Sequence, residues 1–143
     1  MPGPSARRRF PPASRIRKRL EFEAAQNGGR RATTAHFVFL LYARNETVAP
    51  ARLGIVASRK VGNAVVRNRA KRLVREAFRN SRDLFSPGTD VVVIVRRPLE
   101  ESKLSEVVSE WRRAAAVLDK RAAEARNDRD MRAGNFDEAE RKR

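Results

Sequence analysis

The sequence contains no cysteine and only one histidine, His36. Without cysteine the chain cannot form disulfides, thiolate zinc fingers or a thiol nucleophile. With one histidine it cannot use a pair of imidazoles as acid and base. The lack of cysteine also fits a reducing compartment, and we expect a cytoplasmic protein.

Long apolar runs are absent as well. The longest, Phe37–Tyr42, has the length of a strand, whereas a membrane-spanning helix needs about 20 apolar residues. The basic segment Met1–Arg9 is not followed by an apolar stretch, so it does not resemble a secretory signal. We therefore expect no membrane association.

Acidic residues are few: the chain has 17 Asp and Glu and 33 Lys and Arg, which give a formal net charge of +16. So many positive charges repel one another in a compact domain, which favours a polyanionic partner. Nucleic acid is the first candidate. Carboxylates that hold Mg²⁺ occur in clusters, but those of the folded part are dispersed. They are Glu21, Glu23, Glu46, Asp83, Asp90, Glu100 and Glu101. We therefore predict that the protein alone binds no metal or cofactor and has no nuclease activity.

Composition divides the 143 residues into one domain between two tails. Residues 1–13 are rich in proline and arginine, which is typical of disorder. Residues 119–143 carry alternating charges and few large apolar residues, so we expect a charged extension that is partly helical or disordered. Residues 14–118 form the expected α+β domain.

Within this domain, periodicity and turn residues predict the order helix, two or three strands, helix, strand, helix. A continuous apolar run at Val91–Val95 is typical of a strand covered on both faces. The expected elements are a helix at 18–26, strands at 36–43 and 52–58, a helix at 63–80, a strand at 90–96 and a helix from 102 or 105 to about 118.

The helix at 63–80 has two different faces. An apolar stripe at helical spacing consists of Val66, Ala70, Leu73, Val74 and Ala77. The opposite face is basic and consists of Arg67, Asn68, Lys71, Arg72, Arg75 and Arg79. Like charges four residues apart destabilise an isolated helix by roughly 0.2–0.5 kcal/mol per pair, so this stripe favours phosphates opposite it.

A solvated basic face is the alternative interpretation. Solvated faces usually interleave acidic residues, whereas only Glu76 interrupts this one, and arginine outnumbers lysine. The arginine fork matches phosphate and guanine edges, which favours nucleic acid. Before the helix, Arg59 and Lys60 precede a turn in which Asn63 is the expected N-cap. This turn is compatible with an anion site, with a simple capped turn, or with both.

The segment Arg52–Arg79, with Arg67-Asn68-Arg69 followed by Lys71-Arg72 and Arg75, resembles the signature of the bacterial ribonuclease P protein family and its RNR motif. Weaker similarity extends from Arg15 to about Ala114 and leaves both tails outside. The resemblance implies a small basic subunit of a ribonucleoprotein endonuclease that removes the 5′ leader from precursor tRNA. In that family the RNA subunit carries the catalytic Mg²⁺, and no further protein partner is required.

The resemblance also implies a fold and residue roles. The fold is similar to the second domain of ribosomal protein S5, with a left-handed crossover around the RNR helix where pattern alone predicts a right-handed one. The residues implied in binding the RNA subunit are Arg67, Asn68, Arg69, Lys71, Arg72 and Arg75. Those implied in binding the leader or nearby phosphates are Phe22, Tyr42, Val56, Ser58, Arg59 and Lys60.

Two positions depart from the family pattern. Gln26 stands where the family often has a second aromatic, and Leu40 stands near its usual strand tyrosine. For Phe22 and Tyr42, ordinary core packing is the alternative to a leader contact. At the level of function, a structural RNA-binding protein of the ribosome or its assembly is the alternative. A DNA-binding helix-turn-helix is disfavoured, because strands flank the basic helix on both sides.

Overall fold

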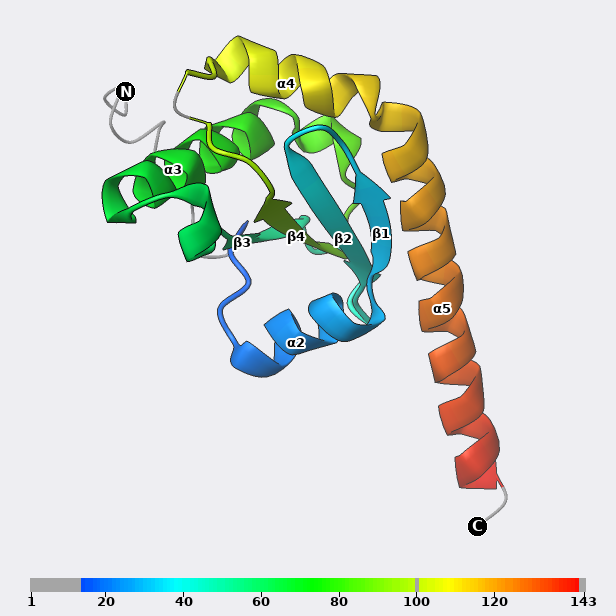
Figure 1. Cartoon of the computed structure of the whole chain (residues 1–143). Coiled ribbons are helices and arrows are strands. Elements are labelled where there is room, and N and C mark those ends of the chain that lie inside the picture. Colours follow the sequence, from blue (N-terminus) through cyan, green and yellow to red (C-terminus); the bar gives the residue numbers. More distant parts are fainter. Residues whose placement is uncertain (1–13, 100, 142–143) are drawn as a thin grey trace, which may run out of the picture.

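The computed structural model describes residues 14–99 and 101–141, and it has helices on both faces of a four-stranded sheet (Figure 1). The predicted α+β class is confirmed. The N-terminal tail that we predict to be disordered lies outside the described residues. The elements are α2 (Arg19–Gly28), β1 (Arg30–Thr33), β2 (Phe37–Ala43), β3 (Arg52–Val56), the 3-10 turn η2 (Arg59–Val61), α3 (Ala64–Asn80), the 3-10 turn η3 (Arg82–Leu84), β4 (Thr89–Val95), α4 (Leu104–Arg113) and α5 (Ala115–Arg141).

The sheet has the strand order β1-β2-β4-β3. The pairs β1–β2 and β2–β4 are antiparallel, and β3 runs parallel to β4. Parallel neighbours need a crossover connection, and α3 supplies it. On the outer edge of β3, Arg15 forms a bridge to Leu53, so the chain before α2 lies beside the sheet.

Strand β4 lies between two neighbours, and both of its faces are covered. Val91, Val92 and Val93 are fully buried, as the apolar run predicts. Val91 and Val93 belong to the larger core, which also contains side chains of α3, α4 and α5. Val92 belongs to a smaller core on the opposite face, together with Ala25 of α2.

Aromatic rings fill much of the larger core. Trp111 of α4 is fully buried and meets Phe37 and Phe39 edge-on, with ring centroids 5.7 and 5.2 Å apart. Phe85 stacks on Phe78 of α3 at 5.3 Å and also touches the indole. Edge-to-face contacts add to the burial of apolar area, so this cluster ties α3 and α4 to the sheet.

The C-terminal part of the described chain is almost entirely helical, whereas its composition indicates an extension that is only partly helical or disordered. The last predicted helix is two helices, divided at Ala114, where the backbone turns with φ −89° and ψ 3°. We expected the domain to end at Leu118, but α5 continues to Arg141 and also buries Ala122 and Ala125. Its charged residues have partners on the sheet, since Asp128 pairs with Arg30 at 2.8 Å. Among the described residues, no helix is long and apolar enough to cross a membrane.

The Trp111 cluster makes a first prediction. Trp111→Ala should lower the free energy of unfolding by about 3–5 kcal/mol, because a fully buried indole leaves a cavity. Leu73→Ala on α3 is the comparison variant, and its loss should be smaller because Leu73 is only half-buried. Urea unfolding of both variants measures the difference, and equal losses would contradict the central place of Trp111.

Candidate RNA-binding surface

A short turn sets the start of α3. Val61 of η2 is buried in the larger core, and Gly62 follows with φ of +150°. A side chain at this position would be strained, and its Cβ would lie 2.8 Å from the side chain of Val66. Asn63 then caps the helix, because its side-chain oxygen accepts a hydrogen bond from the backbone N–H of Val66 at 3.0 Å. The predicted N-cap is confirmed.

The apolar face of α3 packs as the sequence predicts. Ala70, Val74 and Ala77 are fully buried, while Val66 and Leu73 are half-buried against the same core. Phe78, which lies outside the predicted stripe, is also fully buried. The direction of the basic face therefore follows from the packing of its opposite side.

The RNR residues do not share one face, which corrects the prediction for Arg67. Arg67 is half-buried at the margin of the core, and its Nε is buried without a hydrogen-bond partner. Arg69 lies on the other margin and donates to the carbonyl oxygen of Ser102 at 3.4 Å. Residues two apart in a helix differ by about 200° in direction, so these two arginines flank the helix on opposite sides. Between them Asn68 and Arg72 are exposed.

Like charges crowd one side of α3. Arg75 is exposed as a residue, but partial desolvation of its guanidinium, and then the positive charges of Arg15 and Arg72, lower its pKa. A lowered pKa means that the surroundings disfavour the charged guanidinium. A phosphate group placed among these three side chains would relieve that cost.

The segment before α2 joins this basic face to the opposite side of the sheet. Arg15 lies beside β3 near Arg75, and Ile16 donates its backbone N–H to the carbonyl oxygen of Leu53 at 3.1 Å. The side chain of Ile16 packs against the smaller core on the α2 face. Basic residues therefore continue around the outer edge of β3, from α3 to α2.

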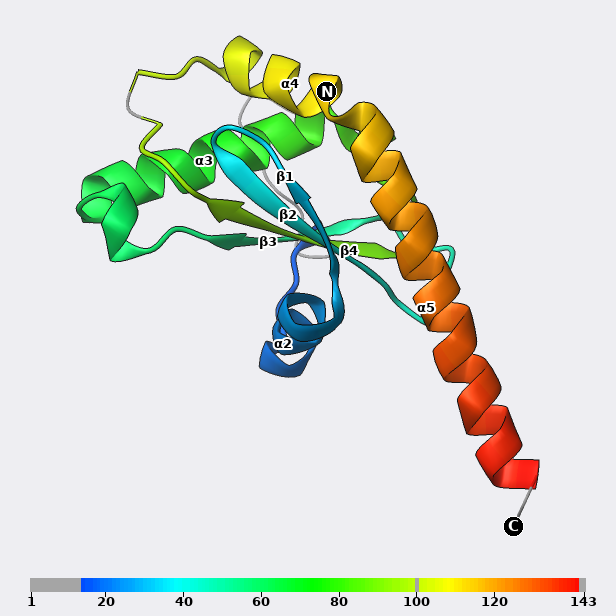
Figure 2. The same ribbon diagram turned by 45° about the vertical axis from the view of Figure 1, so that its right-hand side comes forward.

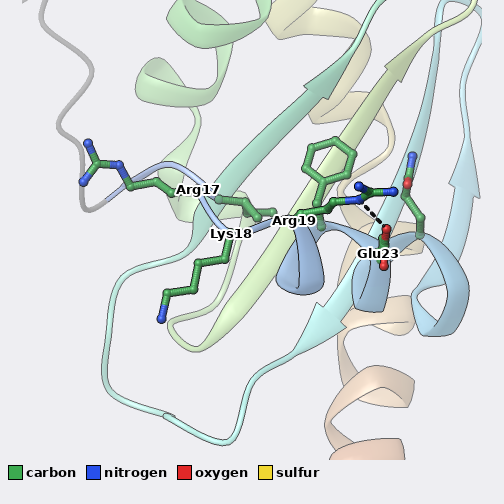
Figure 3. A pocket seen from close by; sticks show the side chains of 7 residues that line it. Arg17, Lys18, Arg19 and Glu23 are labelled. Atoms are coloured by element: carbon green, nitrogen blue, oxygen red, sulfur yellow. Dashed lines mark hydrogen bonds and ion pairs between the residues drawn. The ribbon is translucent and has the colours of Figure 1, made fainter.

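On the α2 face this segment lines a cavity of about 360 Å³ (Figure 3). Arg19 folds back onto Glu23 with a 2.9 Å hydrogen bond, while Arg17 and Lys18 extend away from the helix (Figure 3). The complete lining is Ile16, Arg17, Lys18, Arg19, Phe22, Glu23 and Gln26. A cavity that combines an aromatic ring with three basic side chains suits a single-stranded nucleic acid, although Glu23 also lines it and pairs with Arg19.

The ring of Phe22 lies directly on the sheet at Gly54. A Cβ added to Gly54 would be 2.6 Å from the ring, so only glycine leaves room for this contact. The ring therefore serves two purposes: it anchors α2 in the smaller core and lines the cavity. Core packing and a leader contact, which the sequence left as alternatives, are compatible for this residue.

The other predicted leader residues are divided between two places. Val56 is half-buried in the smaller core, and Ser58, Arg59 and Lys60 are exposed around η2. Tyr42 does not line the Phe22 cavity. The strand register places Val56 opposite Ile94 and Tyr42 opposite Asp90, four residues apart on β4, which corresponds to about 13 Å.

Tyr42 lines a second cavity, of about 380 Å³, beside a buried ion network. Asp90 is 1% exposed and accepts hydrogen bonds from Arg44 and Arg52, both at 2.8 Å. Arg52 also pairs with Glu21, so the network fastens α2 to the sheet. Hydrogen bonding to Asp90 raises the pKa of Arg52 despite its partial burial. One side of the Tyr42 ring is occupied, because the guanidinium of Arg132 lies over it with its carbon 4.5 Å from the centroid.

Sequence reasoning missed two parts of this surface. The basic run Arg15–Arg19 was visible in the sequence but lay at the edge of the expected helix, so we gave it no role. Nothing in the sequence pointed to Arg132, which reaches Tyr42 only because α5 packs along the sheet. Within the described ranges, no three His, Cys, Asp or Glu side chains are grouped so that they could hold a metal ion.

The contact between Phe22 and Gly54 makes a second prediction. Gly54→Ala should displace the Phe22 ring and loosen α2, with a loss of stability of about 1–3 kcal/mol from overpacking. Hydrogen exchange should show faster exchange of the α2 amides and little change in α3. The matched control is Gly134→Ala on α5, where no atom lies within 4 Å of the added Cβ. Unchanged protection of α2 would contradict the anchoring role of the ring.

Comparisons with known proteins agree with this geometry. Residues 10–119 match the family model described as Ribonuclease P. A protein from Desulfovibrio desulfuricans named Ribonuclease P protein component is 40% identical over 109 residues, which cover 76% of this chain and 80% of the relative. A relative of the same name from Geobacillus kaustophilus is 40% identical over 94 residues, or 65% of this chain and 76% of the relative.

Solved structures give the same result. The RNase P protein from Staphylococcus aureus is 29% identical with a TM-score of 0.61, and the match covers 73% of this chain and 94% of that one. The RNase P protein from Thermotoga maritima is 32% identical with a TM-score of 0.60, covering 76% of this chain and 96% of that one. Motif, fold and both comparisons agree, and the chain belongs to the ribonuclease P protein family, the protein components of that ribonucleoprotein enzyme.

Proposed function

We propose that this subunit of ribonuclease P binds the catalytic RNA through α3 and holds the single-stranded 5′ leader of precursor tRNA in the Phe22 cavity. One observation carries the proposal. Arg15 lies at the edge of β3, close enough to Arg75 of α3 to lower its pKa, and the chain then continues to Arg17–Arg19 at the cavity. Two RNA segments could therefore be held side by side on one small domain.

The α3 surface is suited to a folded RNA with closely spaced phosphates. Arg72 and Arg75 are exposed on the face that the core leaves outward, and the arginine fork donates two parallel hydrogen bonds to phosphate oxygens. Arg67 adds a guanidinium whose buried Nε makes no hydrogen bond within the described part of the chain. Because this Nε is buried, bound RNA can reach only the remaining N–H groups of the guanidinium.

The α2 cavity is suited to unpaired nucleotides. Sequence-tolerant binding of single strands combines cations along the backbone with aromatic rings on which bases stack. The cavity offers Phe22 as the ring and Arg17 and Lys18 as cations that extend freely at its rim (Figure 3). Gln26, which replaces a second aromatic, can donate and accept hydrogen bonds at a base edge.

In this proposal the chemistry belongs to the RNA subunit and to the Mg²⁺ ions that it binds. The protein brings a net charge of +16 to two polyanions that repel each other. Neutralising their phosphates releases counterions, so the contribution of the protein should fall steeply with salt. We place this activity in the cytoplasm.

Reconstitution tests the proposal. The purified protein should not cleave precursor tRNA alone, and with its cognate RNA subunit it should restore cleavage at the 5′ end of the mature tRNA at low Mg²⁺. No stimulation of a competent RNA subunit would contradict the assignment. Sequencing the RNA that co-purifies with the protein separates this function from a role in the ribosome, which predicts ribosomal RNA instead.

A substitution on α3 gives the third prediction. Arg72→Ala should weaken binding to the RNA subunit and lower the slope of log K against log salt by about 1, since one phosphate contact is lost. The fold should be unaffected because Arg72 is exposed. Filter binding at several salt concentrations measures both quantities.

The matched control for Arg72→Ala is Arg113→Ala, which removes an exposed arginine from α4. It lowers the net charge equally but leaves α3 intact, so it should change neither the affinity nor the slope by as much. Equal effects of the two variants would mean that total charge, and not the face of α3, determines the binding.

A further inference from the structure

Helix α5 extends well beyond the part of the chain that the family model matches. The match ends at residue 119, whereas the helix continues to Arg141. It packs along β1 and β2 and then runs past the sheet, on the side where α2 lies (Figures 1 and 2). This chain therefore carries an element next to the α2 face that lies outside the family match.

Ion pairs hold α5 in place along β1. Arg30 donates two hydrogen bonds of 2.8 Å to the carboxylate of Asp128, and it also lies 3.5 Å from Glu124. Arg121 donates to the carbonyl oxygen of Arg31 at 3.0 Å. These contacts fix the direction of the helix up to the turn before Arg132.

Arg132 is placed with little freedom. Its Nη2 donates to the carbonyl oxygen of Ala43 at 2.7 Å, while the guanidinium lies over the ring of Tyr42 at 4.5 Å. The residue is nevertheless exposed. The guanidinium therefore has an aromatic ring on one side and remains accessible to solvent.

Nucleobases stack on aromatic rings and also on arginine guanidinium planes. A guanidinium that is already held by a ring and a carbonyl group loses little freedom when a base stacks on it. The edge of Tyr42 lines the second cavity, on the same face of the sheet as Phe22. The ring and the guanidinium together form a platform. Phe22 lies at Gly54, which pairs with Val92, and Tyr42 pairs with Asp90, so the platform is two residues, or about 7 Å, along β4 from the Phe22 contact.

We propose that Arg132, held over Tyr42 by α5, is a second contact for the single-stranded leader, on which a nucleobase stacks. This inference rests on the proposed function of the α2 face. The chain has Gln26 and Leu40 where the family often has aromatics, and the Arg132–Tyr42 pair supplies stacking surface in their place. The pair extends leader binding to nucleotides farther from the Phe22 cavity.

The test uses the reconstituted holoenzyme and two precursor tRNAs, one with a long single-stranded leader and one with a leader of a single nucleotide. Arg132→Ala should weaken binding of the long-leader substrate by about fivefold or more, the lower range for loss of one stacked base. Binding of the short-leader substrate should not change. Arg132→Lys should behave like Arg132→Ala, because lysine keeps the charge but has no plane.

The control variant is Lys120→Ala, which removes an exposed positive charge from α5 far from Tyr42. It should leave binding of both substrates unchanged. Circular dichroism of Arg132→Ala should show the same helix content as the wild type. Arg132→Lys should show it as well, in a variant that keeps the positive charge.

Four results would overturn the inference. Equal effects on both substrates would mean that Arg132 does not contact the leader. Wild-type binding of the long-leader substrate by Arg132→Lys would mean that only the charge matters. Tighter binding of the long leader by Arg132→Ala would mean that Arg132 covers Tyr42 and excludes the leader. If the wild-type holoenzyme itself does not distinguish the two substrates, the proposed leader site fails, and the inference fails with it.

Discussion

Strand β4 has to be covered on both faces, and the rest of the structure depends on this constraint. Its run of valines can be buried only if helices pack on each side of the sheet. The crossover helix α3, with α4 and α5, covers one side. The other side is left to α2, a helix of 10 residues that is too short to cover it completely. The cavities on the α2 face are what remains uncovered.

The same constraint sets the direction of the charges. Because Ala70, Val74 and Ala77 must face the larger core, the arginines of α3 must face outward or lie at the margins of that core. The electrostatic cost of this crowding is visible at Arg75, whose pKa is lowered by partial desolvation and by the positive charges of its neighbours. On the opposite face, by contrast, the charge of Asp90 is buried and fully paired with Arg44 and Arg52. The charges that fasten α2 to the sheet are therefore buried or half-buried and paired, whereas Arg75 of α3 lies close to the positive charges of Arg15 and Arg72.

Helix α5 shows how charged residues can belong to a folded element. Between Leu118 and Gly134 its buried residues are Ala122 and Ala125, and charged pairs such as Arg30–Asp128 also connect it to the sheet. Exposed pairs contribute little each, about 0.2–1 kcal/mol, but several along one helix are enough to set its direction. Because α5 is held along the sheet in this way, Arg132, which lies outside the family match, contacts the ring of Tyr42.

The sequence by itself determined the class of fold, the apolar face of α3, its Asn63 cap and the covered strand β4, because these depend on periodicity and local turn chemistry. It also carried the family resemblance, which the comparisons confirm. Only the tertiary structure decided that Arg67 is half-buried at the margin of the core, that Phe22 rests on Gly54, and that Tyr42 and Phe22 line different cavities. These facts depend on which segments meet across the sheet, and contacts such as Arg132–Tyr42, between residues 90 positions apart, leave no periodic signal in the chain.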